Sequence, residues 1–304
     1  MSTPAAVRVR GLSKAYGSML VVDDLSFDVA PGTVCALLGP NGAGKTTTVE
    51  CIEGFRRPDA GEVSVLGLDP RRDRDALVAR MGVMLQEGGA WQAATPREML
   101  RLYARFHARP ADVEQLLAEV GIAGVADRRF RILSGGQKQR LNLALALVGH
   151  PEVVFLDEPT AGMDPQARQA TWTMVRRLRA EGVTVLLTTH FMDEAERLAD
   201  EVVLIDGGRL VAQDSPAALV ASGAGDELLV TTTAAVDLQA LQRELGISGA
   251  ADGSGRYRLD VGAEAIPRVT GWFDRNGLPL TGIDAGGGGL EEVFLRLTGR
   301  QVRE

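Results

Sequence analysis

The chain has 304 residues, of which 45% are hydrophobic and 24% are charged, a composition typical of soluble globular proteins with one large or two ordinary domains. Its formal net charge of −7 argues against nucleic-acid binding, because that function generally requires a basic face that neutralises phosphates. No segment approaches the ~18 apolar residues of a membrane span, and the N-terminus lacks a secretory signal pattern, so we expect any membrane-spanning part to lie in another chain.

Strand-like runs alternate with helix-like segments over the first 220 residues. The strand-like runs lie at 7–10, 25–30, 33–39, 153–158, 184–190 and 201–208. Several are apolar throughout, as are parallel strands that are buried on both faces. The alternation therefore predicts an α/β domain at 1–220 with a mainly parallel core sheet. Residues 90–135 show helical patterns without a good strand, which indicates a helical subdomain inserted between two halves of the sheet.

Tyr16 stands just after the first of these runs and is one of three tyrosines in the chain. An aromatic ring in this position can stack on an adenine base. The alternative interpretation is an aromatic residue at a strand edge with no ligand.

The segment GPNGAGKT matches the phosphate-binding pattern G-x-x-x-x-G-K-[ST], and it lies between a predicted strand and a predicted helix. The glycines let backbone N–H groups converge on phosphate oxygens, and the helix start adds positive potential. The lysine supplies charge for the outer phosphates, and the hydroxyl of Thr46 suits Mg²⁺. The nucleotide-binding residues predicted here are Gly39, Pro40, Asn41, Gly42, Ala43, Gly44, Lys45, Thr46 and Thr47. The motif alone does not separate a transporter motor from a kinase or a GTPase.

The run VVFLDE at 153–158 predicts a buried strand that ends in two adjacent carboxylates. Asp157 can hold Mg²⁺ through water, whereas Glu158 points the other way and suits a general base that activates water. An acidic strand end that faces solvent is the alternative interpretation.

Gln86 and His190 each follow a predicted strand. The glutamine can reach both Mg²⁺ and the attacking water, although a surface glutamine after a strand is common. The histidine faces the ligand crevice at the carboxyl end of the sheet, where a neutral ring can bond the γ-phosphate and orient the water. An ordinary capping histidine is the alternative.

The turn LSGGQ offers a hydroxyl and two glycine N–H groups at the start of a predicted helix, which makes a second anion site. Its residues are Ser134, Gly135, Gly136 and Gln137. The chain has one good phosphate-binding loop, so this turn has no obvious phosphate of its own. We therefore expect it to bind the γ-phosphate of a nucleotide held by a second copy, which predicts a head-to-tail dimer.

The pattern changes after about residue 220. Strand-like runs at 227–232, 256–261 and 280–284 alternate with helical segments at 238–245 and 265–277. A final segment, 290–300, carries its apolar residues on one helical face. These features predict a small α+β accessory domain at 221–304.

The set GPNGAGKT, Gln86, LSGGQ, VVFLDE, AGMD and His190, in this order, resembles the nucleotide-binding domains of ABC transporters over roughly residues 5–217. The resemblance implies a P-loop ATPase that uses ATP and Mg²⁺, and it would place Asp164 at the dimer seam. Met163 stands where leucine is commoner in the family. The resemblance also implies that Gln86 and the helical subdomain pass motion to separately encoded integral membrane permease subunits, at the cytoplasmic face of a bacterial membrane.

The C-terminal helix is similar to the end of ATPase subunits of ABC-2-type exporters, including the daunorubicin-resistance-like multidrug group, which favours export of drugs, lipids or other hydrophobic compounds. One alternative is a soluble ABC-type ATPase without transport, although the long coiled coils or fused ATPase domains of such proteins are absent from the sequence. The other is a P-loop enzyme such as a kinase, which would leave LSGGQ, Gln86 and His190 unexplained.

Overall fold

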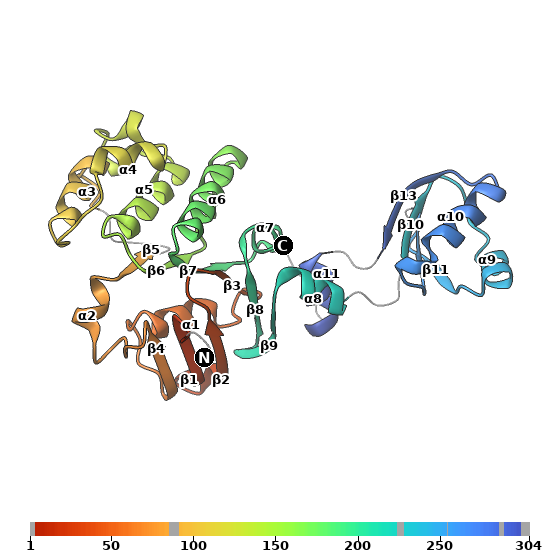
Figure 1. The fold of residues 1–304 in the computed structure, drawn as a ribbon, viewed down its shortest axis with the longest axis horizontal. Coiled ribbons are helices and arrows are strands. Elements are labelled where there is room, and N and C mark those ends of the chain that lie inside the picture. The colour runs from red at the N-terminus through yellow and green to blue at the C-terminus, as the bar shows by residue number, and fades with distance from the viewer. Residues whose placement is uncertain (1–3, 85–90, 224–227, 254, 286–288, 299–304) are drawn as a thin grey trace. The chain divides into compact units, whose positions relative to one another are not determined.

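The computed structural model describes residues 4–84, 91–223, 228–253, 255–285 and 289–298 (Figure 1). The chain forms two compact units, Met1–Ser215 and Pro216–Glu304. Within the described part of the chain, no helix is both long and apolar enough to cross a membrane.

A six-stranded sheet forms the centre of the first unit. Its order is β5-β6-β7-β3-β8-β9, and its neighbours run parallel except for β8 and β9. The strands are β3 (Val34–Leu38), β5 (Met81–Met84), β6 (Val153–Asp157), β7 (Thr184–Thr189), β8 (Glu201–Asp206) and β9 (Arg209–Asp214). Every residue of β3, β6 and β7 is buried, because these runs are apolar enough to be covered on both faces. The predicted α/β fold with a mainly parallel core sheet is confirmed.

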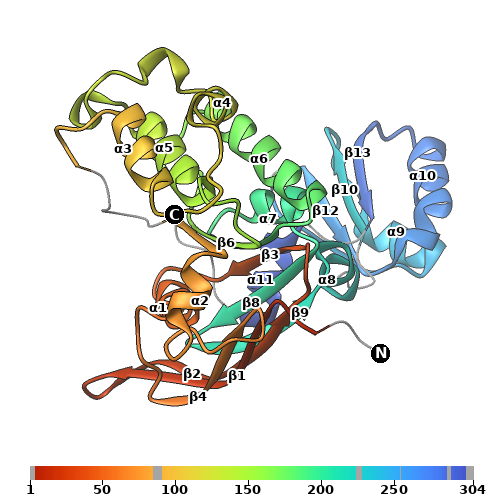
Figure 2. The same ribbon diagram turned by 60° about the vertical axis from the view of Figure 1, so that its left-hand side comes forward.

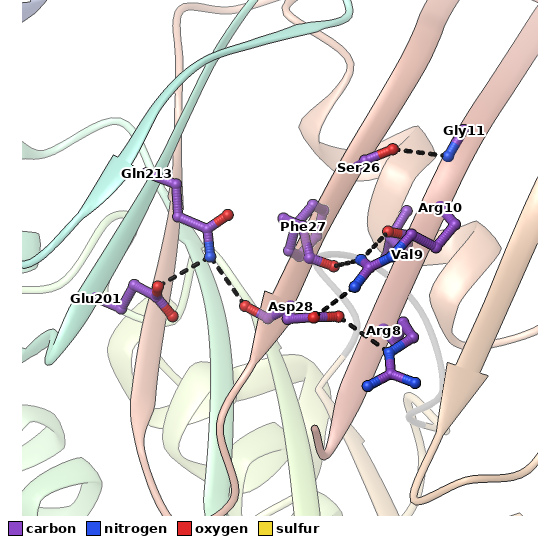
Figure 3. Close-up of polar contacts among 9 residues, drawn as sticks. All are labelled: Arg8, Val9, Arg10, Gly11, Ser26, Phe27, Asp28, Glu201 and Gln213. Atoms are coloured by element: carbon purple, nitrogen blue, oxygen red, sulfur yellow. Dashed lines mark hydrogen bonds and ion pairs between the residues drawn. The ribbon is translucent and has the colours of Figure 1, made fainter. Parts of the chain in front are cut away.

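The first two predicted strands do not join this core sheet. They form a separate antiparallel sheet of order β2-β1-β4. Its members are β1 (Val7–Tyr16), β2 (Met19–Val29) and β4 (Ala60–Val65). Gln213 on β9 links the two sheets, since its amide donates to the carbonyl of Asp28 at 3.0 Å and to Glu201 Oε1 at 2.9 Å (Figure 3). Arg10 ties β1 to β2 by donating to the carbonyl of Phe27.

Helices connect and cover the strands of the first unit (Figure 2). Those beside the core sheet are α1 (Lys45–Ile52), α2 (Arg74–Val78), α6 (Pro165–Ala180) and α7 (Met192–Leu198). The helical subdomain contains α3 (Pro96–Ala104), α4 (Val113–Glu119) and α5 (Gly135–Leu147), with short 3-10 helices η1 (Ala123–Val125) and η2 (Phe130–Ile132). The described residues from 91 to 134 contain no strand, as the sequence pattern predicts.

The second unit contains a four-stranded antiparallel sheet of order β11-β12-β10-β13. Its elements are α8 (Pro216–Gly223), β10 (Leu228–Thr232), α9 (Leu238–Leu245), β11 (Gly249–Ala251), β12 (Arg256–Leu259), η3 (Ala263–Ala265), α10 (Ile266–Arg275), β13 (Leu280–Ala285) and α11 (Leu290–Thr298). From β10 to β13 the order strand–helix–strand–strand–helix–strand is that of a ferredoxin-like fold. The sequence pattern missed β11, because this three-residue strand consists of glycine and alanine.

Candidate active site

The loop that joins β3 to α1 is shaped to receive an anion. Gly44 is the N-cap of α1, adopts a φ of 97°, and provides no side-chain cap for the helix. The N–H groups of the first helical turn therefore have no partner within the helix. A β-carbon on Gly39 would lie 2.3 Å from the carbonyl oxygen of Ile205, and one on Gly44 would lie 2.7 Å from that of Val21. Neighbouring backbone thus requires glycine at both positions.

Lys45 lies beneath this loop with 6% of its surface exposed. Its ammonium donates to the carbonyl oxygens of Gly39 at 2.7 Å and Pro40 at 3.2 Å. Burial lowers the pKa of Lys45, while the negative charges of Glu158 and Asp157 act in the opposite direction. A cation held beside an uncapped helix start is a good fit for the phosphates of a nucleotide.

Asp157 is the last residue of β6, and it is paired in register with Thr188 on β7. Only 8% of its surface is exposed, and the Thr188 hydroxyl donates to its Oδ1 atom. Burial raises the pKa of Asp157, although the Thr188 bond and the charge of Lys45 oppose this rise. Thr46 is exposed at the start of α1. A hydroxyl and a carboxylate are hard oxygen donors, so both groups fit Mg²⁺. Gln86, the third predicted ligand, lies outside the described residues.

Glu158 has a φ of 47°, which is uncommon for a residue with a side chain. Its N–H donates to both the carbonyl and the hydroxyl oxygen of Thr188, at 3.2 and 3.0 Å. These bonds fix the left-handed turn after the strand. The Glu158 Oε1 atom lies 3.1 Å from Nδ1 of His190, so the structure brings together the two side chains that were predicted for water activation.

The turn of Ser134–Gln137 forms the start of α5. The Ser134 hydroxyl accepts from the N–H of Gln137 at 3.3 Å, and Gln137 Oε1 accepts from the N–H of Ser134 at 3.0 Å. This is a capping box, which the sequence analysis did not identify. Ser134 and Gly135 are exposed. Among the described residues, no hydrogen bond or ion pair joins this turn to the phosphate-binding loop of the same chain.

No packing contact in the described part of the chain requires glycine at either Gly135 or Gly136. Neither has a positive φ, and their added β-carbons would meet other atoms at 3.8 Å or more. Gly136 faces Met163 and Ala167, so the turn packs against the start of α6. There Asp164 is the N-cap, and its carboxylate accepts from the N–H of Ala167 at 2.9 Å.

Tyr16 ends β1 and is 41% exposed. The guanidinium carbon of Arg56 lies 5.3 Å from its ring centroid, and the ammonium of Lys14 lies 5.7 Å from it. Lys14 pairs in register with Val22 on β2, and Val22 also lies beside Gly44. The Tyr16 ring therefore lies at the end of the β1–β2 pair, and β2 borders the phosphate-binding loop at Val22.

Thr188 is a site residue that the sequence analysis missed. Its only sequence signal is the Thr-Thr pair that precedes His190, and buried threonines are ordinary in strands. The parallel register of β6 and β7 gives it its position opposite the acidic pair.

Comparison with known proteins identifies the family to which the chain is similar. The family model described as "ABC transporter" matches residues 22–161. The chain is 42% identical over 307 residues to Nod factor export ATP-binding protein I of Paraburkholderia xenovorans, covering 99% of both chains. It is 38% identical to daunorubicin resistance ATP-binding protein DrrA3 of Streptomyces coeruleorubidus, covering 98% of both.

Solved structures show the same fold. An ATP-binding subunit of an ABC transporter superposes with a TM-score of 0.66 at 28% identity, covering 71% of this chain and 92% of that one. A dimeric ATP-binding cassette in a post-hydrolysis state, bound to ADP and Pi, superposes with a TM-score of 0.64 at 23% identity and covers 69% of this chain and 98% of that one.

Proposed function

The chain belongs to the family of ABC transporter ATP-binding subunits and is an ATPase, and we propose that it drives an exporter whose membrane-spanning subunits are separate proteins. The observation that carries the export proposal is the similarity over 98–99% of the chain to proteins named for Nod factor export and daunorubicin resistance. That similarity includes the C-terminal unit. We propose drugs, lipids or other hydrophobic compounds as the cargo and the cytoplasmic face of a bacterial membrane as the place of action.

Nucleotide binding is assigned to the loop of Gly39–Thr47, with Tyr16 stacked on the base. The uncapped start of α1 and the ammonium of Lys45 supply positive potential for the phosphates. When Mg²⁺ is bound, Thr46 and Asp157 would hold it, with Gln86 as the third predicted ligand, and the ion would offset phosphate charge.

Glu158 is proposed as the general base. Its carboxylate takes a proton from water as the water oxygen bonds to the γ-phosphorus, and the bond from that phosphorus to the bridging oxygen breaks. The products are ADP and phosphate. His190 contacts the carboxylate through Nδ1, which supports a role in orienting the base and the water.

The Ser134–Gln137 turn is proposed to bind the γ-phosphate of a nucleotide held by a second copy, in a head-to-tail dimer with Asp164 at the seam. The support is the exposed position of Ser134 and Gly135, together with two glycines that no contact among the described residues requires. Close approach of a nucleotide phosphate held by a second copy would explain why glycine stands at both positions.

A capture experiment tests this function. Tagged Glu158→Gln protein would be isolated from solubilised native membranes with Mg-ATP, and the partners would be identified by mass spectrometry. Recovery of a stoichiometric polytopic membrane protein is expected, whereas recovery of soluble proteins or ribosomes alone would contradict the transport proposal. Lys45→Ala protein is the matched control, since weaker ATP binding should reduce recovery of any partner that depends on the ATP-bound state.

A companion assay tests the catalytic assignment itself. Glu158→Gln should reduce ATP hydrolysis by the purified chain at least about 100-fold, the usual contribution of a general base. ATP should remain bound, because the phosphate-binding loop is unchanged. Turnover at the wild-type rate would remove Glu158 from this role.

A further inference from the structure

The side chains of His190, Phe191 and Arg168 form a stack next to Glu158. The rings of His190 and Phe191 have centroids 4.0 Å apart and planes inclined by 39°. The guanidinium carbon of Arg168 lies 4.6 Å from the Phe191 ring centroid. His190 in turn contacts Glu158, so the stack runs from Arg168 to the proposed base.

Arg168 is held mainly by this ring. Its ion pair with Asp193 is long, at 4.0 Å, and its Nε atom is buried without a hydrogen-bond partner in the described structure. A buried arginine N–H without a hydrogen bond costs free energy, and contact of the guanidinium with an aromatic face partly offsets that cost. The geometry therefore favours ring contact over ion pairing as the interaction that positions the guanidinium.

The stack begins at the first turn of α6. The N–H of Arg168 donates to the carbonyl of Asp164 at 3.0 Å, and Asp164 is the N-cap of that helix. The indole of Trp172, one turn further along α6, donates to the buried carboxylate of Glu194 on α7 at 2.9 Å. This second contact fixes α7, which begins directly after Phe191, against α6.

We propose that Phe191 and Arg168 are positioning residues that hold the His190 ring in contact with Glu158. The inference rests on the proposed roles of Glu158 and His190 in hydrolysis. It adds that the turn of Asp164, proposed to lie at the dimer seam, is connected to the hydrolytic site of its own chain through two stacked side chains. A shift of that turn would reach His190 by direct contact.

The test uses basal ATP hydrolysis by the purified full chain. Phe191→Leu removes the ring and retains apolar volume, and Arg168→Met removes the cation and retains the stem. Each should lower kcat by about tenfold, a coupling typical of packed neighbours, with the Kd for ATP unchanged. Phe191→Tyr should keep the wild-type kcat because it keeps the aromatic ring. Arg176→Met, at an exposed position of the same helix, is the control and should match wild type.

Double variants separate positioning from general damage. In a His190→Ala background, Phe191→Leu and Arg168→Met should lower kcat less than about twofold further, because their effect passes through the missing ring. The same tenfold fall in both backgrounds, or no fall in either, would overturn the inference. If His190→Ala itself has wild-type turnover, the proposed role of His190 fails instead. Thermal unfolding of each variant identifies any that does not fold, and the comparison then uses whichever of Phe191→Leu and Arg168→Met folds.

Discussion

Thr188 and Asp157 face each other across the parallel strands β7 and β6, and the threonine hydroxyl donates to the aspartate carboxylate. The same hydroxyl oxygen accepts the N–H of Glu158 at 3.0 Å. One side chain therefore orients both acidic residues of the site. Thr188→Val keeps the shape and removes both bonds. We expect a fall in kcat of about tenfold or more, together with a higher Mg²⁺ concentration for half-maximal activity, since a hydrogen bond to a charged group contributes about 1.5–3 kcal/mol.

Thr184→Val is the matched control for this prediction. Thr184 begins the same strand, is equally buried, and its hydroxyl accepts the N–H of Gly32 at 2.9 Å. Loss of the Thr184 hydroxyl should reduce the stability of the fold while leaving the Mg²⁺ dependence of ATP hydrolysis unchanged. Thr188→Ser should retain most activity because the hydroxyl remains. An Mg²⁺ titration of ATP hydrolysis measures all three, and equal curves for the two valine variants would refute the assignment to Thr188.

Gly136→Ala should separate folding from activity. An added β-carbon would lie 3.8 Å from Met163 and Ala167, which is ordinary van der Waals contact, and the residue is helical. We expect unchanged or higher stability, by up to about 1 kcal/mol, because alanine restricts the unfolded chain. Turnover should nevertheless fall if a phosphate of a second copy approaches this turn. Stability is measured by urea unfolding and turnover by ATP hydrolysis, both on one preparation of the variant. Wild-type turnover would contradict the proposal that this turn binds a phosphate across the dimer.

Ser134→Ala addresses the same turn through its hydroxyl. Because Ser134 is also an N-cap, the variant should lose about 1 kcal/mol of stability whatever its role in catalysis. Thr95→Ala removes the corresponding hydroxyl from the capping box of α3 and is therefore the appropriate control. Both variants should be destabilised, and only Ser134→Ala should lose turnover while a single chain still binds ATP. A pure defect in ATP binding would exclude the role across the dimer.

Much of the site was predictable because its motifs are local. The loop of Gly39–Thr47 and the acidic pair at the end of β6 each consist of residues that are adjacent in sequence, and the structure places them at the carboxyl ends of β3 and β6, with β7 between these two strands. Thr188 was not predictable, since its role depends on the register between two strands 30 residues apart in the chain. The capping roles of Gln137 and Asp164 were missed because the same residue types suit both a helix start and a phosphate contact.

In the fold, too, local features were predictable from the sequence and long-range strand pairing was not. The apolar runs predict buried parallel strands correctly, but nothing in the alternation of residues 7–29 distinguishes a strand of the core sheet from one of a separate antiparallel sheet. That distinction comes from pairing with β4, which lies beyond α1 in the sequence.

Glu53, at the end of α1, predicts a pH dependence of stability. Its side chain is 3% exposed, and burial together with the charges of Asp157 and Glu50 raises its pKa from the ordinary 4.5 to about 8. Between these values the folded chain keeps a proton that the unfolded chain releases. The free energy of unfolding should therefore fall as pH rises from about 5 to 8, by up to about 1.4 kcal/mol per pH unit from this group.

Glu53→Gln should flatten that fall, because glutamine carries no charge in either state. Its stability relative to wild type should thus increase steadily from pH 5 to pH 8. Glu62→Gln, at an exposed position on β4, is the control and should run parallel to wild type. Urea unfolding at several pH values gives the difference directly. A Glu53→Gln curve that also runs parallel to wild type would show that Glu53 ionises at the same pH in the folded and unfolded chains, and burial would then have to be relieved by water or by a neighbouring cation.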